Sequence, residues 1–411
     1  MSKPTRPPLG MPYAEFIGIM AVLMALTALS IDIVLVVLPD IASEFALPQQ
    51  NHQQHVVTAY MAAFALGHLF MGPLSDRFGR RPVLLVGIAI YVVGSVIAIF
   101  SDSFYVLLIA RAIQGFGAAA PRVIAVAVVR DRFVGRGMSQ VMSFVMTVFI
   151  MLPMIAPAIG KLIALMGSWH PIFTFLALVG TGMFIWVLLR LPETNPRNTP
   201  DAKPAVSVLE AVRTILGSGQ TVGYTLAQGF IFGCLMTYIA SSQQVLADLY
   251  GIVEWFPLVF ASVAAAMVVS SLVNARLVQT VGMRRLSHSA LLSLVALSAL
   301  GSVSLMVGGT LPFWVFLTFM GIAFFLIGLI LPNFNAMAME PLGAIAGTGS
   351  SLVGFVMTAC GALLGAAVGQ LYDQSLMPII LGYLTFSLIS LTFVMITEKG
   401  RLLQPTAQPV G

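Results

Sequence analysis

The chain of 411 residues is 59% hydrophobic, and only 9% of its residues are charged. Soluble globular domains carry about 25% charged residues, so this composition excludes an ordinary soluble enzyme or binding domain. The mean hydropathy of +0.98 places nearly the whole chain in a lipid bilayer. The net charge of +5 includes no long basic cluster, which excludes nucleic acid as a partner.

Apolar runs of membrane-spanning length recur along the whole chain. A helix that crosses a bilayer needs about 20 predominantly apolar residues. The first run lacks the short apolar region and small-residue cleavage site of a signal peptide, so we expect it to remain as an anchor. Twelve runs predict spans at residues 13–39, 50–73, 83–100, 104–129, 138–166, 171–190, 220–247, 255–280, 286–308, 311–338, 345–372 and 376–397.

The positive charges indicate the orientation of these spans. An even number of spans puts both chain ends on one side of the membrane. With that side inside, the inner segments contain all 20 Lys and Arg residues except Arg111, Arg122 and Lys161. Cytoplasmic loops carry an excess of such residues. Both ends are therefore predicted to be cytoplasmic.

The longest polar segment divides the chain into two halves. Residues 191–219 separate a predicted N-terminal six-helix bundle at 1–190 from a predicted C-terminal bundle at 220–411. Apolar residues recur at helical spacing from Val206 to Leu216, as in a helix on the membrane surface or in a solvated linker. Gly72–Pro82 after span 2 has a weaker copy at Asn274–Arg285 after span 8, without an acid. We therefore predict an all-α integral membrane protein of two pseudo-symmetric six-helix bundles around a central site.

Asp32 is the one acidic residue well inside a predicted span. Ionisable residues inside a membrane are costly and often relay protons. Asp32 and Arg111 each lie seven residues from the outer end of their spans, about 10 Å deep at 1.5 Å per residue. Asp32 is therefore predicted either to carry a proton or to form a fixed ion pair with Arg111. Arg111 is either an anchor of the fold or a modulator of that acid.

Other intramembrane residues extend this candidate site. Arg122 lies eleven residues after Arg111 and returns to within about 20° of the same helix face, which predicts that this stripe faces a wet cavity or the other helices and not lipid. Snorkelling of Arg122 toward the cytoplasm is the alternative. His68 is expected to be packed and hydrogen-bonded. Adaptable and aromatic side chains suit an apolar pocket, and the pocket candidates in spans 5, 7 and 10 are Met142, Phe144, Met146, Phe232, Tyr238 and Asn333.

Two prolines interrupt the fifth span. Pro153 and Pro157 precede Gly160, and such interruptions are tolerated where neighbouring helices satisfy the freed backbone groups. They predict either a hinge or seal between the halves or plain packing through Gly160. The cysteines, Cys234 and Cys360, lie within spans without metal-ligand spacing. No nucleotide-binding loop, catalytic triad or metal cluster is recognisable, so we expect neither an enzyme nor an ATP-driven pump, and no cofactor or metal.

Several motifs resemble those of one family. Gly72-Pro-Leu-Ser-Asp-Arg-Phe-Gly-Arg-Arg-Pro82 resembles the signature between spans 2 and 3 of the major facilitator superfamily. Arg111-Ala-Ile-Gln-Gly115 is similar to the span 4 motif of its proton-driven members, and Ser30–Pro39 to the span 1 motif of its twelve-span drug:proton antiporters. Val129–Asp131, Met142–Phe144 and Ser168–Phe173 resemble the bicyclomycin and chloramphenicol/florfenicol exporter branch, called Bcr/CflA-like.

This resemblance implies export of small drug-like molecules from the bacterial cytoplasm against proton entry, by alternating access in the inner membrane. The partners would be the substrate, protons and the lipid bilayer, and we expect a monomer. Asp32 would carry the proton with Arg111 beside it. The gate and conformational switch would comprise Gly72, Asp76, Arg77, Gly79, Arg80, Arg81, Gln114, Gly115, Pro153, Pro157 and Gly160.

Two departures from the family pattern limit this transfer. Ala156 replaces a glycine before Pro157 and Lys161 follows Gly160, which departs from the seal signature and puts a cation near the outer mouth. Met24 stands where some related exporters have a second acid, so one proton per cycle is expected. The alternatives are a proton-coupled exporter of a metabolite such as an amino acid or sugar, a passive facilitator, and a transport-dead sensor or scaffold. Unchanged drug susceptibility with altered metabolite release would favour the first of these.

Overall fold

The computed structural model describes residues 10–133, 135–195 and 208–403. Within this part of the chain, twelve helices are long and apolar enough to cross a membrane, and no strand occurs. Each predicted span is confirmed, with ends that differ by a few residues. The all-α membrane fold expected from the hydropathy is therefore confirmed.

The first span is broken directly after Asp32. It consists of α1 (Tyr13–Asp32), a 3-10 turn at η1 (Val34–Val37) and α2 (Leu38–Glu44). A short 3-10 stretch within a helix often marks a hinge or a functional position. The span predicted as one run thus changes helix type at its membrane-embedded acid.

The other five spans of the N-terminal half are regular helices. The fifth continues as a helix through Pro153 and Pro157, so the interruption expected there is not a break in helical structure. These helices are α3 (His55–Phe78), preceded by η2 (Gln50–Gln54), then α4 (Arg80–Ile99), α5 (Phe104–Arg132), α6 (Gly135–Ala164) and α7 (His170–Arg190).

A short helix, α8 (Val208–Gly217), lies between the halves in the sequence and packs against α13. Helical spacing predicted this helix, although Val206 lies outside the described residues. Leu216 on it is 69% exposed. The C-terminal half contains α9 (Gly219–Tyr250), α10 (Phe256–Val281), α11 (Met283–Gly308), α12 (Phe313–Met339), η4 (Glu340–Ile345), α13 (Ala346–Gln370) and α14 (Met377–Thr397).

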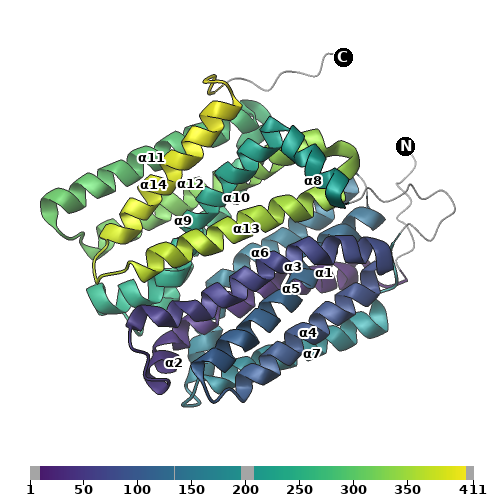
Figure 1. The fold of residues 1–411 in the computed structure, drawn as a ribbon, viewed down its shortest axis with the longest axis horizontal. Helices are drawn as coiled ribbons and strands as arrows, with labels where there is room; N and C mark the ends of the chain where they lie inside the picture. Colours follow the sequence, from purple (N-terminus) through teal and green to yellow (C-terminus); the bar gives the residue numbers. More distant parts are fainter. Residues whose placement is uncertain (1–9, 134, 196–207, 404–411) are drawn as a thin grey trace.

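The two halves lie side by side, with the first half below and the second above in Figure 1. Across their boundary, α3 packs along α13 and α6 packs along α10. We call the end of the bundle where α7 ends and α9 begins the linker end, and the opposite end the far end. Because successive spans alternate in direction, α1, α4 and α9 begin at the linker end, and α3, α5 and α14 end there.

Small residues set the closest helix contacts. A Cβ built at Gly67 would lie 2.5 Å from Ala119 Cβ, and one built at Gly117 would lie 2.4 Å from the Tyr91 backbone nitrogen. Membrane helices associate largely through such close backbone approach, because lipid offers no hydrophobic driving force between them. Glycines thus fix how α5 sits between α3 and α4, and thereby where its arginines point.

Candidate functional site

Arg111 is fully buried within the N-terminal half. Its Nε donates to the Val56 carbonyl at 3.1 Å, and its Nη2 donates to the Ser30 carbonyl at 3.1 Å. Its Nη1 donates to Gln114 Oε1, and Gln114 in turn donates to Ser95 Oγ at 2.7 Å. The guanidinium therefore joins α1, α3 and α4 to α5, and Gln114 takes part in this network.

Asp32 is 3% exposed, yet it forms no hydrogen bond or ion pair with another described residue. The pairing with Arg111 considered from sequence is therefore absent in this structure. The two residues lie at a similar level, because Arg111 binds the carbonyl of Ser30.

Gly160 packs against the break in the first span. A Cβ at Gly160 would lie 2.5 Å from the Ile33 carbonyl oxygen, so α6 approaches α1 beside Asp32. Between the two interpretations of this region, the structure gives Gly160 a packing role within its own half. The neighbouring Lys161 reaches the C-terminal half, where its Nζ donates to the Glu254 carbonyl.

Arg122 lies on the side of α5 that faces α6. Its guanidinium carbon is 4.3 Å from the Phe149 ring centroid, and its Nη1 is buried without a hydrogen-bond partner. The side chain is close enough to His68 to act on it electrostatically. His68 itself is buried with Nδ1 at 3.0 Å from the Phe64 carbonyl, as expected for a packed histidine. The guanidinium therefore lies against a neighbouring helix within the bundle, which does not fit the snorkelling alternative.

The pocket candidates of span 5 lie on two different faces of α6. Met142 and Met146 share a face of α6 with Phe149 by their spacing of four and three residues, and both pack against the core. Phe144 lies about 160° around the helix from Met146 and is 51% exposed. Phe144 is thus directed away from the face that meets Arg122.

The candidates of spans 7 and 10 differ in their surroundings. Tyr238 is 2% exposed, and its hydroxyl is buried without a partner. Phe232 packs against Gly361, where an added Cβ would lie 2.2 Å from the ring. Asn333 donates to Asn274 Oδ1 at 2.6 Å and to the Leu329 carbonyl at 2.7 Å. Asn333 therefore holds α12 to α10, and Tyr238 retains free hydrogen-bonding capacity.

Several buried polar side-chain atoms of the described residues have no hydrogen-bond partner. Buried polar groups without partners are rare and costly. Gln228 on α9 is 0% exposed, and both atoms of its amide lack a partner. The signal available in the sequence was a neutral amide inside an apolar run, as at Asn333. Further buried atoms of this kind belong to Thr27, Tyr60, Thr225, Tyr238 and Ser241.

A cluster of charged residues joins the spans at the linker end. Arg80 is 4% exposed and forms ion pairs with Asp76 at 2.5 Å and Asp131 at 2.9 Å. A Cβ at Gly72 would lie 2.1 Å from Ser351 Oγ on α13. At Gly72, one of the residues that the resemblance assigns to the gate, α3 thus approaches the C-terminal half closely, one helical turn before Asp76.

Glu193 completes this cluster, although the sequence analysis placed it in the linker. Its carboxylate accepts the backbone N–H groups of Arg80 at 2.9 Å and Arg81 at 3.1 Å, and those of Thr194 and Asn195 at 2.8 Å each. Burial favours a higher pKa for Glu193, but these backbone donors hold its pKa below the ordinary value. A carboxylate at a helix N-terminus is also favoured by the helix dipole. The end of α7 is thus tied to the start of α4.

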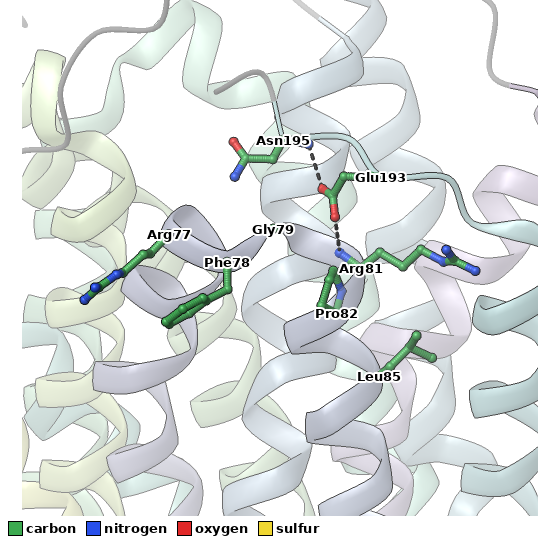
Figure 2. A pocket seen from close by; sticks show the side chains of 8 residues that line it. All are labelled: Arg77, Phe78, Gly79, Arg81, Pro82, Leu85, Glu193 and Asn195. Atoms are coloured by element: carbon green, nitrogen blue, oxygen red, sulfur yellow. Dashed lines mark hydrogen bonds between the residues drawn. The ribbon is translucent and has the colours of Figure 1, made fainter. Parts of the chain in front are cut away.

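The space beside Glu193 is a pocket of about 570 Å³ (Figure 2). Gly79, with a φ of +103°, turns the chain between α3 and α4 at its edge. The guanidinium of Arg77 lies 5.2 Å from the Phe78 ring, and Arg81 donates to the Leu188 carbonyl. The described lining residues are Arg77, Phe78, Gly79, Arg81, Pro82, Leu85, Glu193 and Asn195.

We expect Glu193→Gln to lower the thermal unfolding midpoint of the purified protein. One amide oxygen cannot replace a carboxylate that accepts four N–H groups, and loss of a helix cap costs about 1 kcal/mol. Because the pKa of Glu193 in the folded protein lies below 4.5, its contribution is fully present above pH 4.5 and is lost as the pH falls through the folded value. The variant and the wild type should therefore converge in strongly acidic buffer. Asp102→Asn, at an exposed acid, is the control; equal midpoints for Glu193→Gln and wild type at neutral pH would contradict the assignment.

At the far end, neutral amides join the two halves. We call Asn51, Gln54, Gln244 and Gln370 the outer amide cluster. Gln54 Nε2 donates to Gln244 Oε1 at 3.0 Å, and Gln244 Nε2 donates to Asn51 Oδ1 at 2.7 Å. Gln370 Nε2 donates to the Asn51 carbonyl at 2.9 Å. Four side chains from both halves therefore hold the far end together without charge.

Gln244→Ala is expected to favour opening of the far end. It removes two hydrogen bonds between the halves, each worth about 1 kcal/mol, which corresponds to roughly a 30-fold shift in population. Spin labels at Gln49 and Asp373, one exposed position in each half, would report the change as longer distances. Gln140→Ala, at an exposed position, is the matched control. Identical distance distributions in Gln244→Ala and wild type would show that the cluster does not restrain opening.

Comparisons with known proteins identify the fold. A family model described as Major Facilitator Superfamily matches residues 20–366. This chain belongs to the major facilitator superfamily. It is 30% identical to the bicyclomycin resistance protein homolog of Haemophilus influenzae over 89% of this chain and 91% of that protein. It is 26% identical to multidrug resistance protein D of Escherichia coli over 82% of this chain and 83% of that one. The resemblance to the bicyclomycin branch is thereby confirmed.

Solved structures of other superfamily members show the same fold. A bacterial homolog of the human lysosomal transporter Spinster, in an inward-facing and occupied conformation, gives a TM-score of 0.74 at 15% identity, covering 99% of this chain and 100% of that one. The human organic anion transporter MFSD10 gives 0.67 at 18% identity, covering 93% and 100%. Together with the family model that matches residues 20–366 and the twelve apolar helices of the described residues, this fold makes the chain a multi-pass membrane transporter.

The C-terminal half also places a carboxylate, that of Glu398, directly after its sixth span. Gly79 and Gly282, between the second and third spans of each half, have nearly the same conformation, with φ of +103° and +86°. The copy around Gly282 lacks an acid of its own, but Glu398 after the last span accepts from Arg284 Nε at 2.9 Å. Glu398 thus corresponds to Glu193 after span 6. Each half ties its sixth span to its third through a carboxylate.

Proposed function

We propose that this transporter exports small drug-like molecules of phenicol or bicyclomycin type from the bacterial cytoplasm in exchange for protons. The observation that carries the proposal is Asp32, a buried acid without a described partner at the break of the first span. An intramembrane ionisable residue is a functional site by default. The names of the relatives, a bicyclomycin resistance protein homolog and multidrug resistance proteins, support a drug as substrate.

The basic residues support the orientation. Arg77, Arg80 and Arg81 lie at the linker end together with Arg190 and Arg284, and cytoplasmic loops carry such residues. We therefore assign the linker end, and with it both chain termini, to the cytoplasm of a protein in the inner membrane. The outer amide cluster then closes the external side, and the cluster around Arg80 and Glu193 belongs to the internal side.

In this mechanism Asp32 gains a proton when the protein opens outward and loses it to the cytoplasm as substrate binds. The proton gradient then drives the return. Proton and substrate need not touch, because both act by favouring one of two conformations. The break at η1 next to Asp32 gives the first span a place to bend between these conformations.

Drug-evoked proton movement in everted vesicles tests this function. With respiration acidifying the vesicle interior, chloramphenicol or bicyclomycin added outside should dissipate the pH gradient reported by a quenched dye. Vesicles without the transporter provide the baseline. Drug uptake that is independent of the pH gradient would indicate a passive facilitator. If no drug evokes proton movement and the release of an amino acid or sugar is altered, the substrate is a metabolite and not a drug.

A further inference from the structure

Arg122 is a buried cation without an acidic partner among the residues that the structure describes. Its Nη1 is buried and unpartnered, and its guanidinium rests on the Phe149 ring at 4.3 Å. An arginine remains protonated in proteins and carries five N–H donors. An aromatic face supports the plane of the guanidinium but accepts no in-plane N–H group. The in-plane Nη1 donor thus remains available for another acceptor.

The acids of the described chain do not supply that acceptor. The described ion pairs use Glu15, Asp76, Asp131, Glu340 and Glu398, and none involves Arg122. Asp32 lies near the level of Arg111, and Arg111 is eleven residues from Arg122, about 16 Å along α5. The proton-carrying acid proposed above is thus too distant to pair with this cation.

Gln228 presents a second unsatisfied group from the other half. On α9, Tyr224 contacts α12 through Phe334 at a ring distance of 5.2 Å, and Gly229 contacts α13 at Cys360. At about 100° per residue, Gln228 lies between these two faces. Its amide therefore points between α12 and α13, and both its nitrogen and its oxygen lack partners.

Arg122 and Gln228 lie at the same depth. Arg122 is ten residues from the linker end of α5 at Arg132, about 15 Å, and Gln228 is nine residues from Gly219, about 14 Å. His68 on α3 is also ten residues from its linker end. The ring edge of His68 faces Gly354 on α13, where an added Cβ would lie 3.2 Å away. One layer of the bundle thus contains a guanidinium, an amide and an imidazole, and no acid among its described residues.

We propose that Arg122 and Gln228 bind a planar group of the substrate that presents two acceptor oxygens, such as a carboxylate or a nitro group. This inference rests on the proposed export function and names the substrate chemistry of its cytoplasmic half. The guanidinium fork matches two parallel acceptors, which an ammonium does not. The Gln228 amide nitrogen donates to the same group from the opposite half. Cationic substrates are disfavoured at this layer by Arg122.

Matched pairs of compounds test the proposal by measuring their accumulation in cells with and without the transporter. Chloramphenicol is compared with its arylamine analogue, and nalidixate with its methyl ester. We expect wild type to export the nitro or carboxylate member of each pair, which presents two strong acceptor oxygens, at least about tenfold better than the amine or ester, which leaves the buried hydrogen-bonding site partly unpaired. Arg122→Gln should remove this preference, and Arg122→Lys should retain part of it for nalidixate alone. Arg276→Gln, at an exposed arginine, should leave it unchanged.

Gln228→Glu provides an independent variant should Arg122→Gln fail to fold. A carboxylate at this position would pair with Arg122 and repel the substrate oxygens, so the preference should be lost or reversed. Equal export of both members of each pair by wild type, no export of any of the four compounds, or an unchanged preference in Arg122→Gln and Gln228→Glu would overturn the proposal.

The proton assay separates this inference from the proposed function. Chloramphenicol-evoked proton movement that is equal in wild type and Arg122→Gln would support the antiport function and contradict the proposed substrate site at Arg122. Export that is lost in Arg122→Gln but is accompanied by no proton movement in wild type would support the substrate site and contradict the proton antiport.

Discussion

Asp32→Asn is expected to reduce drug-evoked proton movement in everted vesicles to the level of vesicles without the transporter. The amide matches the carboxyl group in shape but cannot gain or lose the proton. Asp32 forms no hydrogen bond with another described residue, so the substitution removes no contact of the described structure. A buried neutral amide also costs less than a buried charge. The thermal midpoint should therefore remain equal to that of wild type or rise.

Two controls make this result specific to Asp32. Asp102→Asn removes an exposed acid and should preserve drug-evoked proton movement. Drug binding by purified Asp32→Asn would show that the pathway is intact while coupling is lost. Equal dissipation of the gradient by wild type and Asp32→Asn would remove Asp32 from the role of proton carrier, and the fold assignment would not be affected.

The membrane fold could be predicted from the sequence because each helix must be apolar along its whole length in lipid. The twelve spans and their alternation follow from this local requirement. Helix geometry also predicted the level of Arg111, which its hydrogen bond to the Ser30 carbonyl, two residues before Asp32, confirms. The same geometry could have excluded Phe144, because a residue two positions from Met142 and Met146 lies on the other side of the helix.

Contacts between distant segments could not be predicted in this way. Glu193 binds the backbone of Arg80 across 113 residues, and Glu398 binds Arg284 across 114. The partners of Arg111 on other helices proved to be the Ser30 and Val56 carbonyls, which any residue type would present. The outer amide cluster consists of neutral residues near helix ends, where such residues are common. In each case the specificity comes from three-dimensional packing and has no local periodic signal.

Gly115→Ala is expected to destabilise the transporter more than an alanine at any of the other glycines discussed above. A Cβ at Gly115 would lie 2.1 Å from the Tyr60 carbonyl oxygen and 2.8 Å from its carbon. These are backbone atoms of α3, so a side-chain rotation cannot relieve the overlap. Overpacking of this kind costs about 3 kcal/mol, and the thermal midpoint of the purified protein should fall by many degrees.

The displacement would also act on the candidate site, because α3 supplies the Val56 carbonyl that binds Arg111. Movement of α3 away from α5 lengthens that hydrogen bond and shifts the Tyr60 ring from the guanidinium, now 4.4 Å from its centroid. Loss of transport should therefore accompany the loss of stability. Gly182→Ala is the matched control, since a Cβ there meets no atom within 4 Å, and alanine in an open helical position stabilises by about 0.5–1 kcal/mol. A Gly115→Ala variant as stable as Gly182→Ala would show that α3 and α5 can separate freely, and Arg111 would then not depend on their contact for its position.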